Sequence, residues 1–184
     1  MDHKDHVRLL RKGIPRPGGT WADFGSGRGA FTLALVQLVG PSAEIYSIDK
    51  DRRALSDQAQ SIQARFPDRA PGRTHFLVVD FRQPLNLPPL DGLVMANALH
   101  FIRDKDNVLK LLHGHLKPGG KFVLVEYNIA RGTPWVPYPI AYSGWEDLAT
   151  RNGFIRTQLL AARPSRTFQE IYSALAIKGN QAQS

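Results

Sequence analysis

The sequence predicts an α/β fold built on an open, doubly wound sheet. From Thr20 to Tyr127, strand-like segments alternate with helical ones, which is typical of right-handed crossovers between parallel strands. Several of the strand-like segments are almost continuously apolar, as expected for strands covered on both faces. After Gly153 two further strand-like segments follow with only a short link, which predicts an antiparallel hairpin. The expected sheet is therefore mostly parallel, with an antiparallel C-terminal hairpin.

In the first half of the chain, turn residues separate the expected elements. Two prolines and three glycines in residues 13–19 end a short first helix. The segment "AFTLALVQLV" is apolar nearly all round and predicts a buried helix, which Gly40 and Pro41 end. The expected elements are a helix at 4–12, a strand at 20–24, a helix at 30–39, a strand at 43–49, an amphipathic helix at 51–66 and a strand at 74–80.

A proline-rich link, "FRQPLNLPPL", separates the two halves. The segment "KPGG" is expected to end the next helix, and Ser143 is expected to cap the one after it, which Asn152 and Gly153 end. The expected elements are a strand at 91–97, a helix at 105–116, a strand at 121–127, a helix at 143–153 and strands at 154–162 and 168–178.

Composition narrows the possible chemistry. The 184 residues predict a single domain at 20–178, with a short basic helix and linker at 1–19 and a flexible tail at 179–184. No cysteine is present, which excludes disulfides, thiolate metal sites and cysteine nucleophiles. No apolar run approaches the roughly 18 residues of a membrane span. Without an apolar leader at its start, the chain is predicted to be cytoplasmic.

Positive charge is concentrated at the two ends of the chain. The net charge is +8, of which residues 1–19 carry +3, residues 20–150 carry +1 and residues 151–184 carry +4. Such flanks suit either a nucleic acid or an anionic membrane surface, and they also suit a solvated surface that keeps the protein soluble. The sequence lacks dense Lys/Arg runs and an interleaving of aromatic and basic residues. Nucleic-acid binding is therefore the less favoured interpretation.

A glycine-rich turn joins the first expected strand to the following helix. Gly25, Gly27 and Gly29 would let backbone N–H groups and the positive end of the helix approach a cofactor, because glycine has no Cβ to block it. Asp49 closes the next strand, about 20 residues further on, where an acid accepts hydrogen bonds from a ribose diol. Dinucleotide sites share both features, so neither identifies the cofactor.

Two further acids favour one cofactor. Asp23, directly before the turn, would repel a pyrophosphate, whereas S-adenosyl-L-methionine carries an ammonium and a sulfonium and no phosphate. Asp80 ends the third strand, where it can accept from an adenine amine, with Phe81 beside it for ring packing. Acids at the ends of neighbouring parallel strands face one crevice. The predicted cofactor is S-adenosyl-L-methionine, with S-adenosyl-L-homocysteine as its product.

At this point the chain resembles the class I S-adenosylmethionine-dependent methyltransferases, and among them the small-molecule enzymes of the ubiquinone/menaquinone biosynthesis type. The resemblance covers about residues 20–178 and rests on these segments in order: "WADFGSGRGAFT", "IYSIDKD", "VVDF", "DGLVMANALHF", "LKPGGKFVLVEY" and "WEDLATRNGF". It implies a Rossmann-like sheet of seven strands and methyl transfer to a small-molecule acceptor by in-line displacement.

The resemblance also implies which residues bind the cofactor. They are Asp23, Gly25, Gly27, Gly29, Asp49, Lys50, Asp80, Phe81 and Asn97. The turn residues and Asp23 would meet the methionine part, Asp49 the ribose and Asp80 with Phe81 the adenine. Asn97 would lie near the amino-acid part of the cofactor or near the methyl that is transferred. Lys50 departs from the family pattern, which often has an apolar residue there, and its aliphatic stem is expected to pack on adenine. Arg28, inside the turn, is a second departure.

Candidate catalytic groups follow the fourth and fifth strands. His100, Glu126 and Tyr127 are the candidates for a base or an acceptor contact, and each also suits packing at the sheet end. Trp135, Tyr138 and Tyr142 would border a planar or apolar acceptor or pack their loop. His113 and His115 are expected at the surface, and His3 and His6 lie near the chain start; no metal constellation is visible.

Three alternatives share this fold or its turn. An RNA or protein methyltransferase would use the basic flanks, but "ANALHF" lacks the proline-containing turn of the N-methylating nucleic-acid enzymes. A nicotinamide-dependent oxidoreductase is disfavoured by Asp23 and by the hairpin. A non-catalytic domain would not need three acids at the strand ends. Neither the methyl acceptor nor the oligomeric state can be predicted from the sequence.

Overall fold

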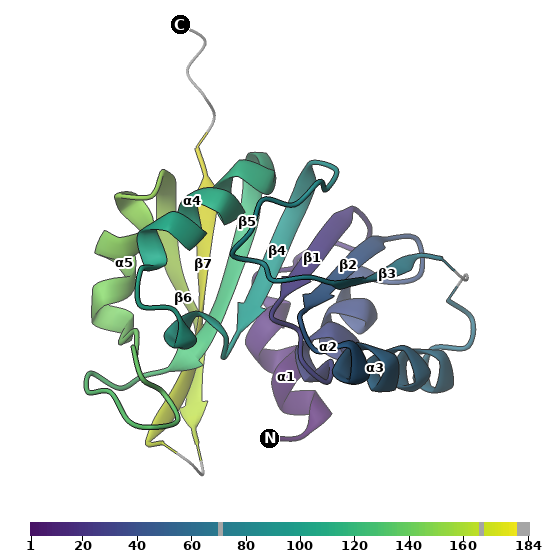
Figure 1. The fold of residues 1–184 in the computed structure, drawn as a ribbon, viewed down its shortest axis with the longest axis horizontal. Coiled ribbons are helices and arrows are strands. Elements are labelled where there is room, and N and C mark those ends of the chain that lie inside the picture. The colour runs from purple at the N-terminus through teal and green to yellow at the C-terminus, as the bar shows by residue number, and fades with distance from the viewer. Residues whose placement is uncertain (70–71, 166–167, 180–184) are drawn as a thin grey trace, which may run out of the picture.

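The protein folds around one mixed sheet (Figure 1). A computed structural model describes residues 1–69, 72–165 and 168–179. The helices are α1 (His3–Arg11), α2 (Ala30–Val39), α3 (Arg52–Arg65), the 3₁₀ turn η1 (Leu99–Phe101), α4 (Lys105–His115) and α5 (Tyr142–Thr150). The strands are β1 (Thr20–Phe24), β2 (Glu44–Asp49), β3 (Thr74–Val78), β4 (Leu90–Ala96), β5 (Leu116–Tyr127), β6 (Phe154–Pro164) and β7 (Glu170–Lys178).

The strand order confirms the predicted topology. The seven strands lie in the order β3-β2-β1-β4-β5-β7-β6. Strands β1 to β5 pair in parallel, whereas β7 is antiparallel to both β5 and β6. Because β1 to β4 are parallel, their carboxyl ends and the segments that follow meet at one edge of the sheet, at the bottom of Figure 1.

Two hydrophobic clusters lie on the two faces of this sheet. One joins inward-facing strand residues to α1, α2 and α3, with Leu10, Leu35 and Ile62 among its buried side chains. The other joins the opposite strand faces to α4 and α5, through residues such as Leu109 and Trp145. The apolar stripe of each helix thus covers one sheet face, as the alternation of strands and helices predicts.

The link between β3 and β4 takes the place of a helix. Residues 79–89 contain no helix or strand and cross one face of the sheet (Figure 1). Val79, Phe81, Leu85 and Leu87 pack from this link onto the cluster that α4 and α5 cover. Its prolines prevent a regular helix, and the link instead carries Asp80 and Phe81 to the strand ends.

Two local expectations are wrong. Ala141, not Ser143, is the N-cap of α5, and within the described part of the chain no side chain caps this helix. Strand β5 was expected to begin at residue 121 but begins at Leu116 and includes "KPGG". Leu116 already pairs with Leu90, before an irregularity in the register of β4 and β5. The predicted flexible tail lies, apart from Gly179, outside the described residues. Among those residues no helix has the length and apolar character needed to cross a membrane.

Candidate functional site

A cavity of about 520 Å³ opens at the carboxyl ends of β1 to β4. This volume lies in the range of small-molecule and cofactor sites. Its lining comes from the segments that follow these four strands: Gly25, Gly27, Asp49, Lys50, Val79, Asp80, Phe81, Arg82, Asn97, Ala98, Phe101 and Ile102. The structure therefore brings seven of the nine residues predicted to bind the cofactor to one cavity wall. Asp23 and Gly29 are the two that do not line it.

The glycines of the turn have different surroundings. A Cβ on Gly25 would lie 2.6 Å from the Ala98 Cβ and 3.3 Å from the Phe81 ring, so this glycine allows two cavity walls to meet. A Cβ on Gly27 would have no atom of the described residues within 4 Å. Both glycines have a positive backbone angle φ, +74° and +53°, which residues other than glycine rarely adopt. Gly27 therefore leaves open space where a ligand can approach the backbone.

Asp49 connects the end of β2 to this turn. Its Oδ2 accepts from the Gly27 N–H at 2.8 Å, and its Oδ1 accepts from the Asp51 N–H at 2.9 Å. A carboxylate has about four acceptor positions, so two remain for ligand hydroxyl groups. The same side chain thus shapes the turn and presents acceptors at the cavity wall.

Asp80 forms an ion pair with Arg82 that the sequence did not predict. Arg82 donates to both carboxylate oxygens of Asp80, and this interaction lowers the pKa of Asp80 below its usual range. Arg82 lines the cavity as well, so a cation lies at the wall beside Phe81. Its only sequence signal is a charged side chain two residues after an acid. Asp80 remains ionised at neutral pH, as an acceptor for an amine requires.

Asn97 presents a buried oxygen without a hydrogen-bond partner at the site. It has a left-handed backbone with φ 51°, and its N–H donates to the Val125 carbonyl at 2.8 Å. Its Oδ1 is buried and has no hydrogen-bond partner in the described part of the chain. Buried polar atoms are rarely left without a partner, and backbone strain outside glycine often marks functional sites. Asn97 therefore holds an acceptor ready for a donor from a ligand.

Asp23 and Gly29 lie beside the cavity without lining it. Asp23 is 1% exposed, and its Oδ2 accepts from the Thr32 hydroxyl at 2.6 Å. Burial raises the pKa of Asp23 to about 7, with the nearby Asp49 charge adding to the effect. At Gly29 a Cβ would lie 2.3 Å from the Gln58 side chain, so this glycine allows α3 to pack against the turn. The side chain of Arg28 is exposed, and Arg28 does not line the cavity.

The raised pKa of Asp23 predicts how stability varies with pH. An ordinary value is 3.8, so between about pH 4 and pH 7 the folded state holds a proton that the unfolded chain has lost. The contribution of Asp23 to the free energy of unfolding should therefore be greatest below pH 4. This contribution is lost as the pH rises to about 7. Asn at position 23 keeps an acceptor for Thr32 but does not titrate. In urea unfolding, Asp23→Asn should be more stable than the wild type near pH 8. Its free energy of unfolding should also lack the decrease between pH 4 and pH 7 that the wild type shows. The same decrease in both proteins would contradict the raised pKa of Asp23.

His100 and Glu126 contact each other instead of the cavity. Their side chains are 3% and 1% exposed, and the His100 Nδ1 lies 2.6 Å from the Glu126 Oε2. The Oε1 of Glu126 accepts from the backbone N–H groups of Leu99 and His100 at 3.1 and 3.2 Å. Neither residue lines the cavity. The pair fastens the end of β5 to the turn after Asn97, so the structure gives it a positioning role, and direct proton transfer by either residue stays a prediction.

The remaining aromatic candidates lie around this pair. Tyr127 packs against the rings of His100 and Phe168. The Tyr138 N–H donates to the His100 carbonyl, which anchors the loop after β5 to η1. Trp135 and Phe101 are 76% and 58% exposed, and Phe101 lines the cavity. Of these two exposed rings, Phe101 alone lies at the cavity.

His113 and His115, which were expected at the surface, are partly buried. His113 packs edge-on against Phe154, and His115 stacks with Phe24. Burial lowers the pKa of both groups, and so does the positive charge of Lys178. Within the described ranges, no group of three or more potential metal ligands gathers.

Sequence comparisons identify the family. A family described as "Methyltransferase domain" matches residues 22–122, more than half of the chain. Demethylmenaquinone methyltransferase of Anoxybacillus flavithermus is 31% identical over 134 residues, which are 68% of this chain and 54% of that protein. Ribosomal RNA small subunit methyltransferase H of Verminephrobacter eiseniae is 36% identical over 64 residues, 35% of this chain and 19% of that protein. The chain thus spans about a fifth to a half of these relatives' lengths.

A solved structure has the same fold. The 1,6-didemethyltoxoflavin-N1-methyltransferase of Burkholderia thailandensis superposes with a TM-score of 0.75 at 16% identity, over 97% of this chain and 78% of that one. The fold and the cavity at the strand ends define a methyltransferase-like α/β protein. The chain belongs to the methyltransferase domain family, and the predicted resemblance to the class I S-adenosylmethionine-dependent methyltransferases is confirmed.

Proposed function

We propose that this protein binds S-adenosylmethionine in the cavity at the strand ends and transfers its methyl group to a small-molecule acceptor by in-line displacement. The observation that carries the proposal is the combination, in one cavity, of open space over Gly27 and an unpartnered acceptor on Asn97. A ligand that approaches the turn and offers an N–H donor would satisfy both, and the cofactor's methionine part has such an ammonium group.

The cavity walls supply a complementary group for each part of the cofactor. Asp49 would accept hydrogen bonds from the ribose hydroxyls with its two remaining acceptor positions. Phe81 and the stem of Lys50 would pack against adenine, while Asp80 would accept from its amine. Asn97 would accept from the ammonium group. This assignment keeps each predicted contact that lies at the cavity and removes the direct contacts proposed for Asp23 and Gly29.

The chain's contribution to methyl transfer is positioning and exclusion of water. When bound, the cofactor supplies a methyl group on a sulfonium, which is already activated for displacement. The His100–Glu126 pair would fix the wall from Asn97 to Phe101, and the exposed Phe101 ring would shield the reacting groups. His100, Glu126 and Tyr127 remain the candidates for an acceptor contact, and the first two are hydrogen-bonded to each other.

Relatives support a small-molecule acceptor. The match to the demethylmenaquinone enzyme covers 68% of this chain, whereas the match to the ribosomal RNA enzyme covers 35%. The Burkholderia protein of similar fold carries 1,6-didemethyltoxoflavin together with S-adenosylhomocysteine. A small organic acceptor is therefore the favoured substrate class.

An RNA acceptor is the second candidate, and one surface feature favours it. A groove of about 420 Å³ between α1, α2 and α3 has no acidic residue in its lining, which comprises His3, Lys4, Val7, Arg8, Arg11, Gln37 and Arg65. Four cations around one groove suit a phosphate backbone. Affinity for bulk RNA that falls steeply with salt would support this candidate, and no retention on RNA at low salt would remove it.

The proposed function is tested by calorimetric titration with two ligands. S-adenosylhomocysteine should bind with a dissociation constant in the micromolar range or tighter, and NAD should not bind. Heat with NAD alone would contradict the proposal and favour an oxidoreductase.

A further inference from the structure

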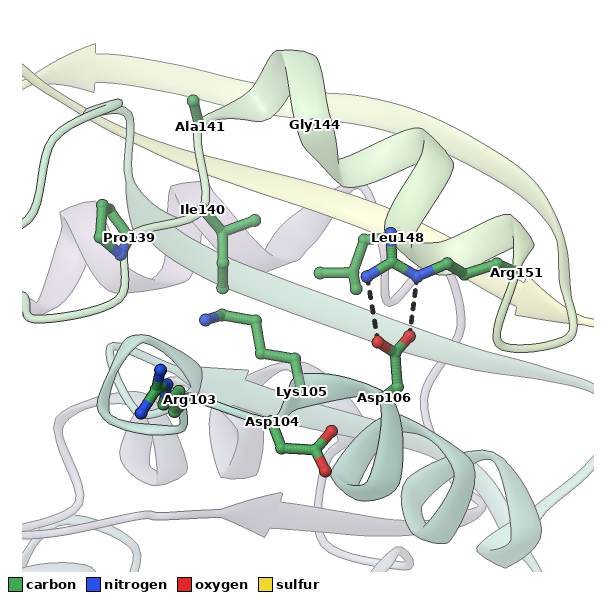
Figure 2. Close-up of a pocket in the computed structure, with 10 residues that line it drawn as sticks. All are labelled: Arg103, Asp104, Lys105, Asp106, Pro139, Ile140, Ala141, Gly144, Leu148 and Arg151. Carbon is green, nitrogen blue, oxygen red and sulfur yellow. Dashed lines mark hydrogen bonds and ion pairs between the residues drawn. The ribbon is translucent and has the colours of Figure 1, made fainter.

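A second hollow, of about 600 Å³, lies between the start of α4 and the segment that leads into α5 (Figure 2). Its lining comprises Arg103, Asp104, Lys105, Asp106, Pro139, Ile140, Ala141, Gly144, Leu148 and Arg151. None of these residues lines the cavity described above. The two hollows meet along the chain, because Ile102 lines the first and Arg103 lines the second.

The acids of this hollow are already bonded to neighbours. Asp106 accepts from Arg151 through both oxygens, at 2.8 and 3.1 Å, and from the Asn152 amide at 2.6 Å. Asp104 caps α4 and accepts from the Asn107 side-chain amide at 2.6 Å. In Figure 2 the Asp106–Arg151 pair closes one end of the hollow. The charge of Arg151 is therefore neutralised, and the acids offer little to a ligand.

Two cations keep free donors at the other end. The Lys105 ammonium donates to the Ile102 carbonyl at 2.8 Å, which uses one of its three N–H groups. Arg103 forms no ion pair with any described residue. Figure 2 shows both side chains at the end of the hollow below Pro139 and Ile140, away from the Asp106–Arg151 pair. This end is therefore positively charged.

The cationic end adjoins an apolar wall. Ile140 and Leu148 are 5% and 7% exposed and line the hollow, together with Pro139. The Lys105 ammonium also lies 5.6 Å from the centre of the Tyr138 ring, within the range of a cation–π contact. Hydrogen bonds from the Tyr138 N–H to the His100 carbonyl and from the Tyr172 hydroxyl to the Ile140 carbonyl hold this wall in place.

We propose that this hollow binds a small organic anion, with a carboxylate or phosphate group on Arg103 and Lys105 and an apolar body against Ile140 and Leu148. Two cations with spare donors suit an anionic group, and the buried aliphatic wall suits a hydrocarbon or aromatic body. If the proposed function holds, this ligand is the methyl acceptor, since the hollow adjoins the cofactor cavity at Ile102–Arg103. The binding itself does not depend on that function.

Two probes with the same naphthalene ring system show how much of the binding depends on the negative charge. In amide NMR spectra of the full chain, 2-naphthoate should shift the Ala141 and Gly144 signals saturably, whereas uncharged 2-naphthol should bind roughly tenfold more weakly, because hydrogen bonds to charged groups are the stronger ones. Arg103→Gln and Lys105→Met should each weaken naphthoate binding severalfold and leave naphthol binding unchanged. Arg156→Gln, at an exposed cation on β6, is the matched control and should change nothing.

The outcome separates this site from the cofactor site. Naphthoate should bind equally well with and without saturating S-adenosylhomocysteine, because the two hollows share no lining residue. Equal binding of naphthol and naphthoate, competition with S-adenosylhomocysteine, or full naphthoate binding by the Arg103→Gln/Lys105→Met double variant would each overturn the proposal. Naphthoate binding without any S-adenosylhomocysteine binding would instead leave the anion site standing and refute the proposed function.

Discussion

Replacing Asp49 by alanine is expected to weaken the binding of S-adenosylhomocysteine by about 1.5–3 kcal/mol, the scale of hydrogen bonds to a charged group. Each 1.4 kcal/mol is a factor of ten, so the dissociation constant should rise by roughly 10- to 150-fold. The effect has two sources, because Asp49 would accept from the ribose and already holds the Gly27 N–H at 2.8 Å. Isothermal titration calorimetry measures it.

Two variants separate these sources. Asp49→Asn keeps an acceptor for the Gly27 N–H and removes the charge, so it should lose less affinity than Asp49→Ala. Asp51→Ala is the matched control: this acid caps α3 through the N–H groups of Arg53 and Ala54 and does not line the cavity. It should weaken the helix and leave cofactor affinity unchanged. Equal affinity of Asp49→Ala and the wild type would mean that the ribose lies elsewhere.

Replacing Glu126 by alanine should give the largest loss of stability. The carboxylate is fully buried and accepts three hydrogen bonds, from Leu99, from the His100 backbone and from the His100 ring. Removing one partner of a buried pair leaves the other unsatisfied and destabilises a protein by about 3–5 kcal/mol. At roughly 2–4 °C per kcal/mol for a domain of this size, Tm should fall by about 6–20 °C. Thermal unfolding followed by circular dichroism measures it.

A conservative variant separates position from charge. In Glu126→Gln the amide oxygen can still accept from the two backbone N–H groups, so most of the wall after Asn97 should stay in place. Its Tm should lie between those of the wild type and Glu126→Ala, and its affinity for S-adenosylhomocysteine should stay close to that of the wild type. A Glu126→Ala protein that melts with the wild type would show that the buried pair does not hold this segment.

The turn and the strand-end acids could be predicted from the sequence because they depend on local spacing. Gly25 and Gly27 follow β1 directly, and Asp49 ends β2; parallel strands then bring such positions to one edge. Asn97 could be placed for the same reason. Its unpartnered oxygen could not, because that depends on a left-handed backbone and on what surrounds it.

The features of the site that the sequence did not predict depend on contacts between distant segments or on the direction of a side chain. His100 and Glu126 are 26 residues apart, and only the pairing of β4 with β5 brings them together. Asp23 could be located beside the turn, but its position does not reveal that its carboxylate turns inward to Thr32. The bond from Arg82 to Asp80 lies in an irregular link with no periodicity to interpret.

The central claim is that the cavity at the ends of β1 to β4 is built for S-adenosylmethionine and not for a dinucleotide. Titration of the wild-type chain with S-adenosylhomocysteine and with NAD, under the same conditions, tests it most directly. The expected result is one saturable site for S-adenosylhomocysteine, in the micromolar range or tighter, and no measurable heat with NAD. Saturable heat with NAD and none with S-adenosylhomocysteine would contradict the account.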